Sequence, residues 1–431
     1  HLDLVYEKRF FMNQFRAAQQ TDQTDHGYLQ IQVVSSENNF PIPDATITIR
    51  NETSPDTVLE ELHTNSSGQT DTITLPSPPL EYSLNPGEPR PYSEYSIQIT
   101  APGFEPLNID GTEVLSGATS IQDARLRPIA LGPSQSIVIP DHTLYGDYPP
   151  KIAEAEIKPV NQSGEIVLSR VVVPETIIVH DGVPTNSSAP NYFVPYRDYI
   201  KNVASSEIYS TWPESTIVAN VLAIMSFTLN RVYTEWYRNK GYDFTITSST
   251  AFDHKWIYGR NFFESISVVV DEIFDQYLSR PNVKQPILTQ YCDGKRVSCP
   301  DWMTQWGSMS LGEQGYSPIE ILRYFYGNDI YINSAEQISG IPASWPGYDL
   351  TIGSSGNKVR QMQEQLLTIS NIYTAIPTIT PSGYFGEDTA EAVREFQSIF
   401  GLAETGIVDF PTWYKISQIY VGVTRIGELN P

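Results

Sequence analysis

The chain has 431 residues, of which 40% are hydrophobic and 18% are charged. It is too long for a single core, so roughly two to four domains are expected. Its 27 basic residues against 50 acidic residues give a formal net charge of -23, which argues against nucleic acid and anionic membranes as partners. No unbroken apolar run of about 18 residues is evident, and we therefore expect no membrane span.

The N-terminal part of the chain predicts a β-sandwich. Residues 28–130 alternate apolar and polar side chains between turn sequences, and a period of two indicates half-buried strands. No helical pattern interrupts these runs, so we expect a small sandwich of two sheets. Before it, residues 1–27 place several apolar side chains on one helical face and predict a short amphipathic helix.

A domain boundary is expected directly after the sandwich. Residues 131–136 are small and polar and lie between strand-like sequences, which is typical of exposed linkers and of sites that proteases cut. We therefore take Gln135, Ser136 and Ile137 as the candidate cleavage region.

Residues 137–345 combine strand-like and helical patterns and predict a mixed α/β domain. Apolar side chains at steps of three and four residues predict a long helix over 213–241 and a second helix over 263–278. Residues 290–315 are rich in glycine and aromatic residues and show no periodicity. Loops of that length are often functional, so catalytic residues are expected in or near this segment.

Residues 346–420 are the last predicted domain, and residues 421–431 follow as a tail. Two helices are expected at 357–369 and 387–400, joined by turns that glycine marks. The pattern closely resembles the three-helix peptidoglycan-binding domain through Ile352, Gly353, Gly356, Val359, Gln363, Leu366, Gly383, Phe396, Gln397, Gly401 and Trp413.

This resemblance implies that the chain binds peptidoglycan. Most of the signature residues are apolar or glycine and are expected to build the bundle and its turns. Aromatic side chains that remain outside the core are candidate platforms for sugar or peptide, and we select Tyr384 and Phe385 for that role.

The central domain carries a second resemblance. Residues 199–208, followed by Trp212 and a long helix, resemble the core of the SpoIID/LytB family of glycan-cleaving enzymes. Family members of this type are lytic transglycosylases, and the resemblance places their catalytic acid on Glu207. Residues that extend the pattern supply the candidate substrate contacts Tyr209, Trp212, Tyr258, Gln290 and Trp306 and the candidate catalytic residue Tyr291.

The chemistry of glycan cleavage is compatible with a single acid. A transglycosylase needs one carboxyl group, which protonates the leaving oxygen and then, as a base, helps the 6-hydroxyl of the same sugar to attack. A hydrolase ordinarily needs a second carboxylate, about 5–5.5 Å away for retention or about 6.5–9.5 Å away for inversion. Asp253 and Glu214 are the candidates for that second group.

The two cysteines, Cys292 and Cys299, leave three interpretations open: a loop disulfide, two ligands of a zinc site, or free thiols. Some SpoIID-type enzymes hold zinc near the active site, and His254 is the candidate third ligand here. Zinc is therefore a candidate cofactor. The spacing differs from the two-residue spacing of structural zinc sites, which favours a disulfide or free thiols.

Three other functions compete with glycan cleavage. A zinc amidase needs a set of His and Glu ligands, but His142, His180 and His254 are scattered without ligand spacing. A cysteine peptidase would pair a cysteine with His254. A structural coat or wall protein would share the peptidoglycan-binding domain and would lack catalysis altogether.

Along nearly its whole length the chain resembles the SleC family of clostridial spore cortex-lytic enzymes, through Leu126-Arg127-Pro128, Asp147-Tyr148-Pro149 and Tyr291-Cys292-Asp293-Gly294-Lys295. The resemblance implies a zymogen that lies in the spore, outside the cytoplasm, and degrades cortex peptidoglycan during germination. A subtilisin-like germination protease would remove residues 1–27 as a pro-segment, together with a sandwich of the transthyretin or carboxypeptidase-regulatory kind. That sandwich either blocks the glycan groove or is a passive adhesion module.

Overall fold

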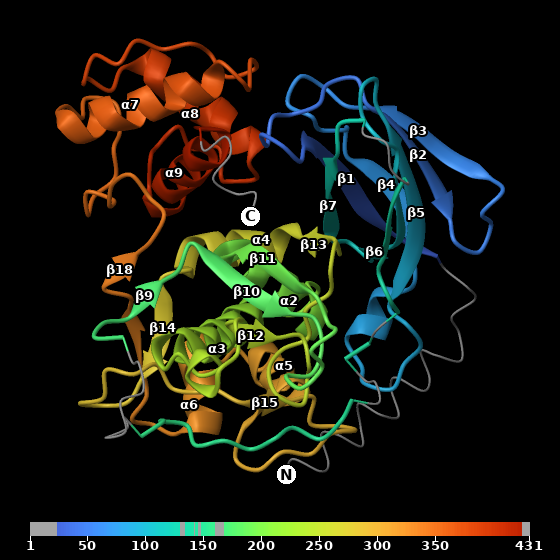
Figure 1. Cartoon of the computed structure of the whole chain (residues 1–431), viewed down its shortest axis with the longest axis vertical. Coiled ribbons are helices and arrows are strands. Elements are labelled where there is room, and N and C mark those ends of the chain that lie inside the picture. The colour runs from blue at the N-terminus through green and yellow to red at the C-terminus, as the bar shows by residue number, and fades with distance from the viewer. Residues whose placement is uncertain (1–23, 130–133, 142, 145–147, 160–167, 425–431) are drawn as a thin grey trace.

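The computed structural model describes the chain except for residues 1–23, 130–133, 142, 145–147, 160–167 and 425–431. Most of the predicted N-terminal helix, half of the predicted linker and the end of the tail therefore lie outside the described residues. Three bodies are visible in Figure 1: a β-rich body in blue, a mixed α/β body in green and yellow, and a helical body in orange and red.

The β-rich body consists of two sheets with the strand orders β13-β7-β1-β4 and β3-β2-β5-β6-β8. Alternate residues of β1, such as Leu29, Ile31 and Val33, are fully buried, which confirms the predicted period of two. Its elements are β1 (Asp25–Ser35), β2 (Thr46–Asn51), β3 (Val58–His63), β4 (Ile73–Ser77), the short helix η1 (Leu80–Ser83), β5 (Tyr92–Thr100), β6 (Leu107–Leu115) and β7 (Thr119–Leu126).

Both sheets are extended by segments from beyond residue 130, which the sequence did not predict. The strand β8 (Gln135–Val138) pairs in parallel with β6, so Gln135, Ser136 and Ile137 form an edge strand. The strand β13 (Phe262–Phe263), from the central body, pairs with β7 in the other sheet. The prediction of an exposed linker is therefore wrong for Gln135 and Ser136, because they pair with β6 and belong to the sandwich.

The central body is mixed α/β, as predicted, but its two long helices are shorter than expected. α3 (Glu214–Tyr233) ends before Glu235, whose φ of 47° is left-handed and stops the helix. α4 (Glu264–Ile273) gives way to the strand β14 (Gln276–Ser279), which pairs with β17.

The remaining elements of the central body surround α3. They are β9 (Val172–Val173), β10 (Thr176–His180), β11 (Asn191–Pro195), α2 (Tyr196–Glu207), η2 (Arg238–Lys240), β12 (Ile246–Thr247), β15 (Tyr291–Cys292), β16 (Met303–Thr304), α5 (Gln305–Glu313), α6 (Pro318–Tyr326), β17 (Tyr331–Ser334) and β18 (Gln337–Ile338).

The helix α3 also bears on the expectation that no segment spans a membrane. Among the residues that the structure describes, α3 is long and apolar enough to cross one by length and composition alone. However, 83% of the apolar window is buried inside the protein. Because core helices pass the same test, α3 is weak evidence for a span.

The helical body confirms both predicted C-terminal helices and adds a third. α7 (Asn357–Ser370) and α8 (Glu387–Ile399) agree with the predicted spans to within one residue at each end. α9 (Phe410–Thr424) completes the bundle and extends into the predicted tail. Val359, Leu366 and Phe396 are buried in its core, as their helical spacing requires.

The helical body is joined to the central body by a buried charge cluster. Asp271 of α4 pairs with Lys415 of α9 and with Lys201 of α2, each at 3.0 Å, and with Arg197 of α2 at 3.3 Å. Burial lowers the pKa of Lys415 from its ordinary value of 10.5 to about 7, although the attraction of Asp271 opposes this shift. The contact between the two bodies is therefore linked to the protonation of Lys415.

This linkage predicts a pH dependence of stability. Between pH 7 and 10 the unfolded chain binds a proton at Lys415 that the folded protein has lost, so the free energy of unfolding rises with pH by roughly 1 kcal/mol per unit. Lys415→Met removes this contribution. We expect urea unfolding at pH 7, 8 and 9 to show a smaller pH slope in Lys415→Met than in the wild type, and equal slopes would contradict the linkage.

Candidate active site

Glu207 is the last residue of α2, at the negative end of the helix dipole, which is an unusual place for an acidic side chain. Its side chain is buried, with 8% of the residue exposed. Oε1 accepts the backbone N–H of Lys255 at 2.7 Å, and the side-chain amide of Gln305 donates to Oε2 at 2.9 Å. The same amide donates to the Glu207 carbonyl oxygen at 2.7 Å, so both the end of the helix and its carboxyl group are fixed.

Glu207 lines a pocket between several segments of the chain. The pocket combines a buried acid with aromatic and polar walls, which is the usual composition of a small-molecule site. Its walls are Leu144, Tyr148, Pro149, Lys151, Glu207, Thr250, Tyr291, Cys292, Asp293, Val297 and Gln305.

The titratable groups around Glu207 respond to its charge. Burial, and after it the Glu207 carboxylate, raises the pKa of Tyr291 well above the usual value for tyrosine. The Tyr291 hydroxyl is buried beside the Glu207 carboxyl group, whose hydrogen bonding to it contributes to this shift. Burial lowers the pKa of Lys151, while Glu207 acts in the opposite direction. The predicted catalytic pair Glu207 and Tyr291 thus lies in one pocket, together with a lysine that the sequence did not suggest.

His254 lies behind the pocket and not at its surface. Its Nδ1 is 2.9 Å from the hydroxyl oxygen of Tyr199, and its ring stacks on Tyr291 with centroids 5.9 Å apart. Burial, followed by the positive charges of Lys151 and Arg231, holds the pKa of His254 well below its usual value. The imidazole is therefore neutral at pH 7 and supports the aromatic wall.

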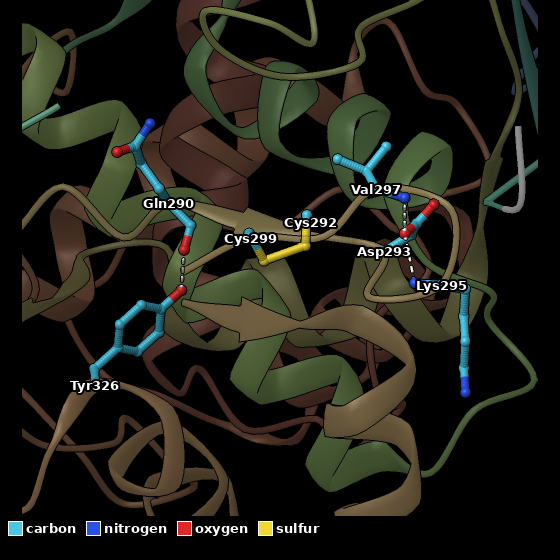
Figure 2. Close-up of a disulfide and its surroundings, with 7 residues drawn as sticks. All are labelled: Gln290, Cys292, Asp293, Lys295, Val297, Cys299 and Tyr326. Atoms are coloured by element: carbon cyan, nitrogen blue, oxygen red, sulfur yellow. Dashed lines mark hydrogen bonds between the residues drawn. A yellow bond between two sulfur atoms is a disulfide. The ribbon is translucent and has the colours of Figure 1, made fainter. Parts of the chain in front are cut away.

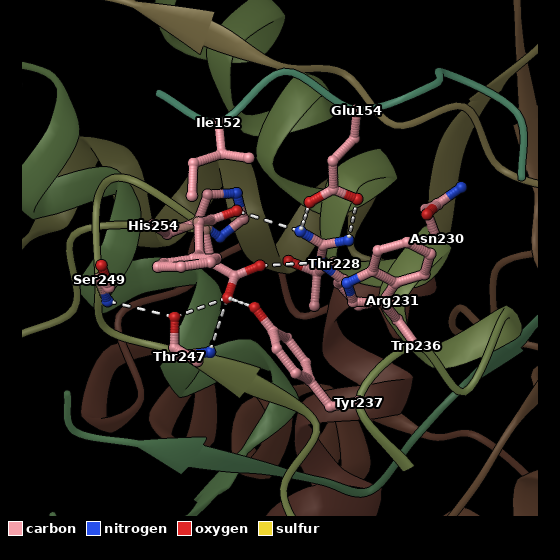
Figure 3. Close-up of polar contacts among 12 residues, drawn as sticks. Ile152, Glu154, Thr228, Asn230, Arg231, Trp236, Tyr237, Thr247, Ser249 and His254 are labelled. Carbon is pink, nitrogen blue, oxygen red and sulfur yellow. Dashed lines mark hydrogen bonds and ion pairs between the residues drawn. The ribbon is translucent and has the colours of Figure 1, made fainter. Parts of the chain in front are cut away.

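The second predicted carboxylate, Asp253, is not available for catalysis. Its Oδ1 accepts from Arg231 at 2.7 Å, and its Oδ2 accepts from Tyr237 at 2.6 Å and from the Thr247 hydroxyl at 2.7 Å. Arg231 also forms two hydrogen bonds with Glu154, at 2.7 and 2.8 Å (Figure 3). This prediction is corrected: Asp253 is saturated by buried donors and does not line the Glu207 pocket.

The cysteines form a disulfide, Cys292–Cys299, which closes the loop that follows β15 (Figure 2). The predicted zinc set of His254, Cys292 and Cys299 is corrected, because zinc requires thiolates and these sulfurs are bonded to each other. Among the described residues no group of three or more His, Cys, Asp or Glu side chains is placed to hold a metal ion.

Asp293, inside the disulfide loop, is a site residue that the sequence analysis did not select. Asp293 lines the same pocket as Glu207, and the residue is 5% exposed. One oxygen, Oδ1, accepts the backbone N–H groups of Lys295 at 2.8 Å and Val297 at 3.0 Å (Figure 2). The other, Oδ2, is buried without a hydrogen-bond partner among the described residues. The only signal in the sequence was its position between Cys292 and a glycine.

The predicted substrate contacts Tyr209, Trp212 and Trp306 form one aromatic cluster, with ring centroids 5.0 to 6.2 Å apart. All three side chains are buried. The indole N–H of Trp212 donates to the carbonyl oxygen of Ser83, in η1 of the sandwich, at 2.8 Å. In the full chain this cluster is therefore covered and cannot touch a substrate.

Two other predicted contacts have structural roles. Gln290 accepts the backbone N–H of Glu154 at 2.9 Å and donates to the carbonyl oxygen of Ile152 at 2.8 Å, which holds residues 148–159 against the central body. Phe385 is 0% exposed and belongs to the core of the helical body, so its assignment as a platform is corrected. Tyr384, by contrast, is 55% exposed and free to meet a ligand.

Tyr258 is the predicted substrate contact of the central body that the structure leaves exposed, with 46% of the residue exposed. Its ring stacks on that of Tyr192 with centroids 4.5 Å apart, and Trp256 packs 5.4 Å from Tyr192. Asn202 of α2 holds the backbone of Ile257 through two hydrogen bonds, of 2.7 and 3.0 Å. Tyr258, three residues beyond Lys255, is thus held close to the helix that carries Glu207.

Comparison with known proteins assigns the C-terminal body. Residues 355–416 match the model of a family described as "Putative peptidoglycan binding domain". The chain therefore has a C-terminal peptidoglycan-binding domain, as its sequence pattern indicated. A "Zinc D-Ala-D-Ala carboxypeptidase" of Streptomyces albus G is 38% identical over 76 residues, which are 18% of this chain and 28% of that protein. The chain thus spans little more than a quarter of that relative.

Solved structures give weaker likenesses. Wild-type catechol 1,2-dioxygenase of Acinetobacter radioresistens is 15% identical with a TM-score of 0.18, covering 27% of this chain and 58% of that chain. The minor pilin GBS52 of Streptococcus agalactiae is 12% identical with a TM-score of 0.18, covering 26% of this chain and 49% of that one. At these TM-scores neither likeness assigns the chain a fold or an activity.

Proposed function

We propose that the chain is a latent cortex-lytic enzyme that cleaves the glycan strands of peptidoglycan as a lytic transglycosylase. The observation that carries the proposal is the buried carboxyl group of Glu207, fixed by Lys255 and Gln305 in a pocket with aromatic walls. The C-terminal peptidoglycan-binding domain supplies the substrate class. Action in the spore cortex during germination is part of the same proposal and rests on the sequence resemblance.

In the proposed reaction Glu207 acts first as an acid and then as a base. Its carboxyl proton goes to the glycosidic oxygen while the bond between that oxygen and the muramyl C1 breaks, and the bonding electrons leave with the oxygen. The muramyl 6-hydroxyl oxygen then forms a bond to C1, and its proton returns to Glu207. No water is consumed, and the acid is regenerated for the next cycle.

We further propose that the sandwich keeps the enzyme latent by covering the aromatic cluster beside Glu207. Ser83 is hydrogen-bonded to Trp212 and, through its hydroxyl, to Thr211 at 2.8 Å. A buried ion pair of 2.8 Å between Glu113 of β6 and Arg260 holds the two bodies together. Leu144, beyond β8, adds a hydrogen bond of 3.3 Å to the Tyr209 hydroxyl. A germination protease of the subtilisin type would relieve this cover.

Limited cleavage of the full chain with subtilisin tests this function. We expect soluble fragments to be released from purified cortex peptidoglycan about tenfold faster or more after cleavage. A factor of about ten corresponds to a full chain in which the site is open in one molecule in ten, since only open molecules are active. The uncleaved chain is the matched control, and binding to the same peptidoglycan should be equal in both forms. Equal rates before and after cleavage would contradict latency, and release by neither form would contradict an enzymatic function.

Hydrolysis of the same bond is the second candidate, and one observation favours it: Asp293 provides a second carboxylate in the Glu207 pocket. An amidase has less support, because no three ligands for a metal come together among the described residues. A structural coat protein would use the peptidoglycan-binding domain but would leave the unpartnered groups of the pocket without a role.

A further inference from the structure

We propose that Asp293 is a second catalytic carboxylate, which faces the reacting sugar in the pocket of Glu207 and stabilises the positive charge that develops on it. This inference rests on the proposed cleavage of glycan strands. It is carried by two observations on one residue: Asp293 lines the pocket that contains the candidate acid, and one of its carboxylate oxygens is buried without a hydrogen-bond partner among the described residues.

The disulfide loop fixes the orientation of Asp293. Gly294 has a φ of +77°, which favours glycine, and a Cβ there would approach Thr304 to 2.5 Å. The turn is closed by the hydrogen bond from the Gly294 N–H to the Val297 carbonyl oxygen, at 3.2 Å, and by the Cys292–Cys299 bond. Figure 2 shows the Asp293 side chain directed at the backbone of this turn through Oδ1. One oxygen is thus fully used by the loop.

The other oxygen has no structural use. A buried polar atom without a partner costs about 1–3 kcal/mol, and more when the group is charged. Asp271 and Asp253, two other buried carboxylates of the central body, are surrounded by cations or hydroxyl donors. Asp293 differs from both because it has an unpartnered oxygen and lines the pocket, where its charge acts on Lys151 and Tyr148. A substrate that carries positive charge or a hydroxyl group in that position would supply the missing partner.

Glycan cleavage creates such a partner in its transition state. When the bond between C1 and the leaving oxygen breaks, positive charge spreads over C1 and the ring oxygen. A fixed carboxylate close to this charge lowers the barrier without any change of its own protonation. In this scheme Asp293 takes no proton, and the proton that Glu207 donates is returned by the 6-hydroxyl group.

Asp293→Asn is the sharpest test, because the amide oxygen can still accept from Lys295 and Val297 and the loop keeps its geometry. Only the charge at Oδ2 is lost. With subtilisin-cleaved full chain and cortex peptidoglycan, we expect kcat to fall about 10²- to 10³-fold with KM nearly unchanged, the usual cost of removing one stabilising group. Asp301→Asn changes an exposed aspartate two residues after Cys299; it is the matched control and should keep the wild-type rate.

The outcomes separate this inference from the function on which it rests. An Asp293→Asn rate within about threefold of wild type would overturn the catalytic role of Asp293 and leave glycan cleavage standing. A fall in kcat with an unchanged melting temperature supports it, and so does a smaller fall in Asp293→Glu, which restores the charge. If wild type releases products with reducing ends and Asp293→Asn is still slow, Asp293 is catalytic and the reaction is hydrolysis. A wild type that cleaves nothing would overturn both proposals.

Discussion

We expect Glu207→Gln to lower the rate of peptidoglycan release by about 10²- to 10⁴-fold, the usual contribution of a general acid or base. Glutamine keeps the volume of the side chain, and its amide oxygen can still accept the N–H of Lys255. The substitution therefore removes the proton of the acid and keeps the volume of the side chain, while its NH2 group replaces the oxygen that accepts from Gln305. The rate is measured as soluble sugar released from purified cortex peptidoglycan by the cleaved full chain.

Glu214→Gln is the matched control for this experiment. Glu214 is exposed at the first turn of α3 and was the other carboxylate that the sequence offered near the motif. We expect it to release peptidoglycan at the wild-type rate. If Glu207→Gln releases peptidoglycan as fast as Glu214→Gln, Glu207 is not the catalytic acid. Binding of both variants to peptidoglycan verifies that the C-terminal domain is intact.

The second large effect is on stability. Asp253→Ala is expected to lower the free energy of unfolding by about 3–5 kcal/mol, because it breaks a buried ion pair and leaves the donors of Arg231, Tyr237 and Thr247 without an acceptor. Glu154 still pairs with Arg231 and limits the loss. Urea unfolding followed by tryptophan fluorescence measures the change.

An exposed aspartate provides the comparison for that measurement. Asp349 is exposed in the segment before α7, and we expect Asp349→Ala to change the free energy of unfolding by no more than about 0.5 kcal/mol. If Asp253→Ala were as stable as Asp349→Ala, the network in Figure 3 would not stabilise the fold. A catalytic role for Asp253 would then have to be considered again.

The helices of the C-terminal domain and the strands of the sandwich were predictable because their patterns are local. Val359 and Leu366 are two helical turns apart and therefore share one face of the helix. Leu29, Ile31 and Val33 are alternate residues of a single strand. The strands β8 and β13 were not predictable. Each has at most four residues and exists because a distant strand supplies its backbone partners.

The candidate acid was found from the sequence through its motif, whereas the rest of the site depends on tertiary contacts. Asp253 and Asp293 are both acidic residues beside other motif residues, and nothing local distinguishes them. Arg231, 22 residues before Asp253, saturates one carboxylate, while the turn at Gly294 leaves an oxygen of the other without a partner. The exposure of Tyr258 and the burial of Phe385 likewise follow from packing and not from residue type.

Mass spectrometry of the fragments that the cleaved chain releases from cortex peptidoglycan tests the central claim most directly. The proposal predicts fragments that end in 1,6-anhydromuramic acid, formed by the wild type and absent with Glu207→Gln. Reducing ends in their place would indicate hydrolysis, and free stem peptides would indicate an amidase; either result would contradict a transglycosylase that works through Glu207.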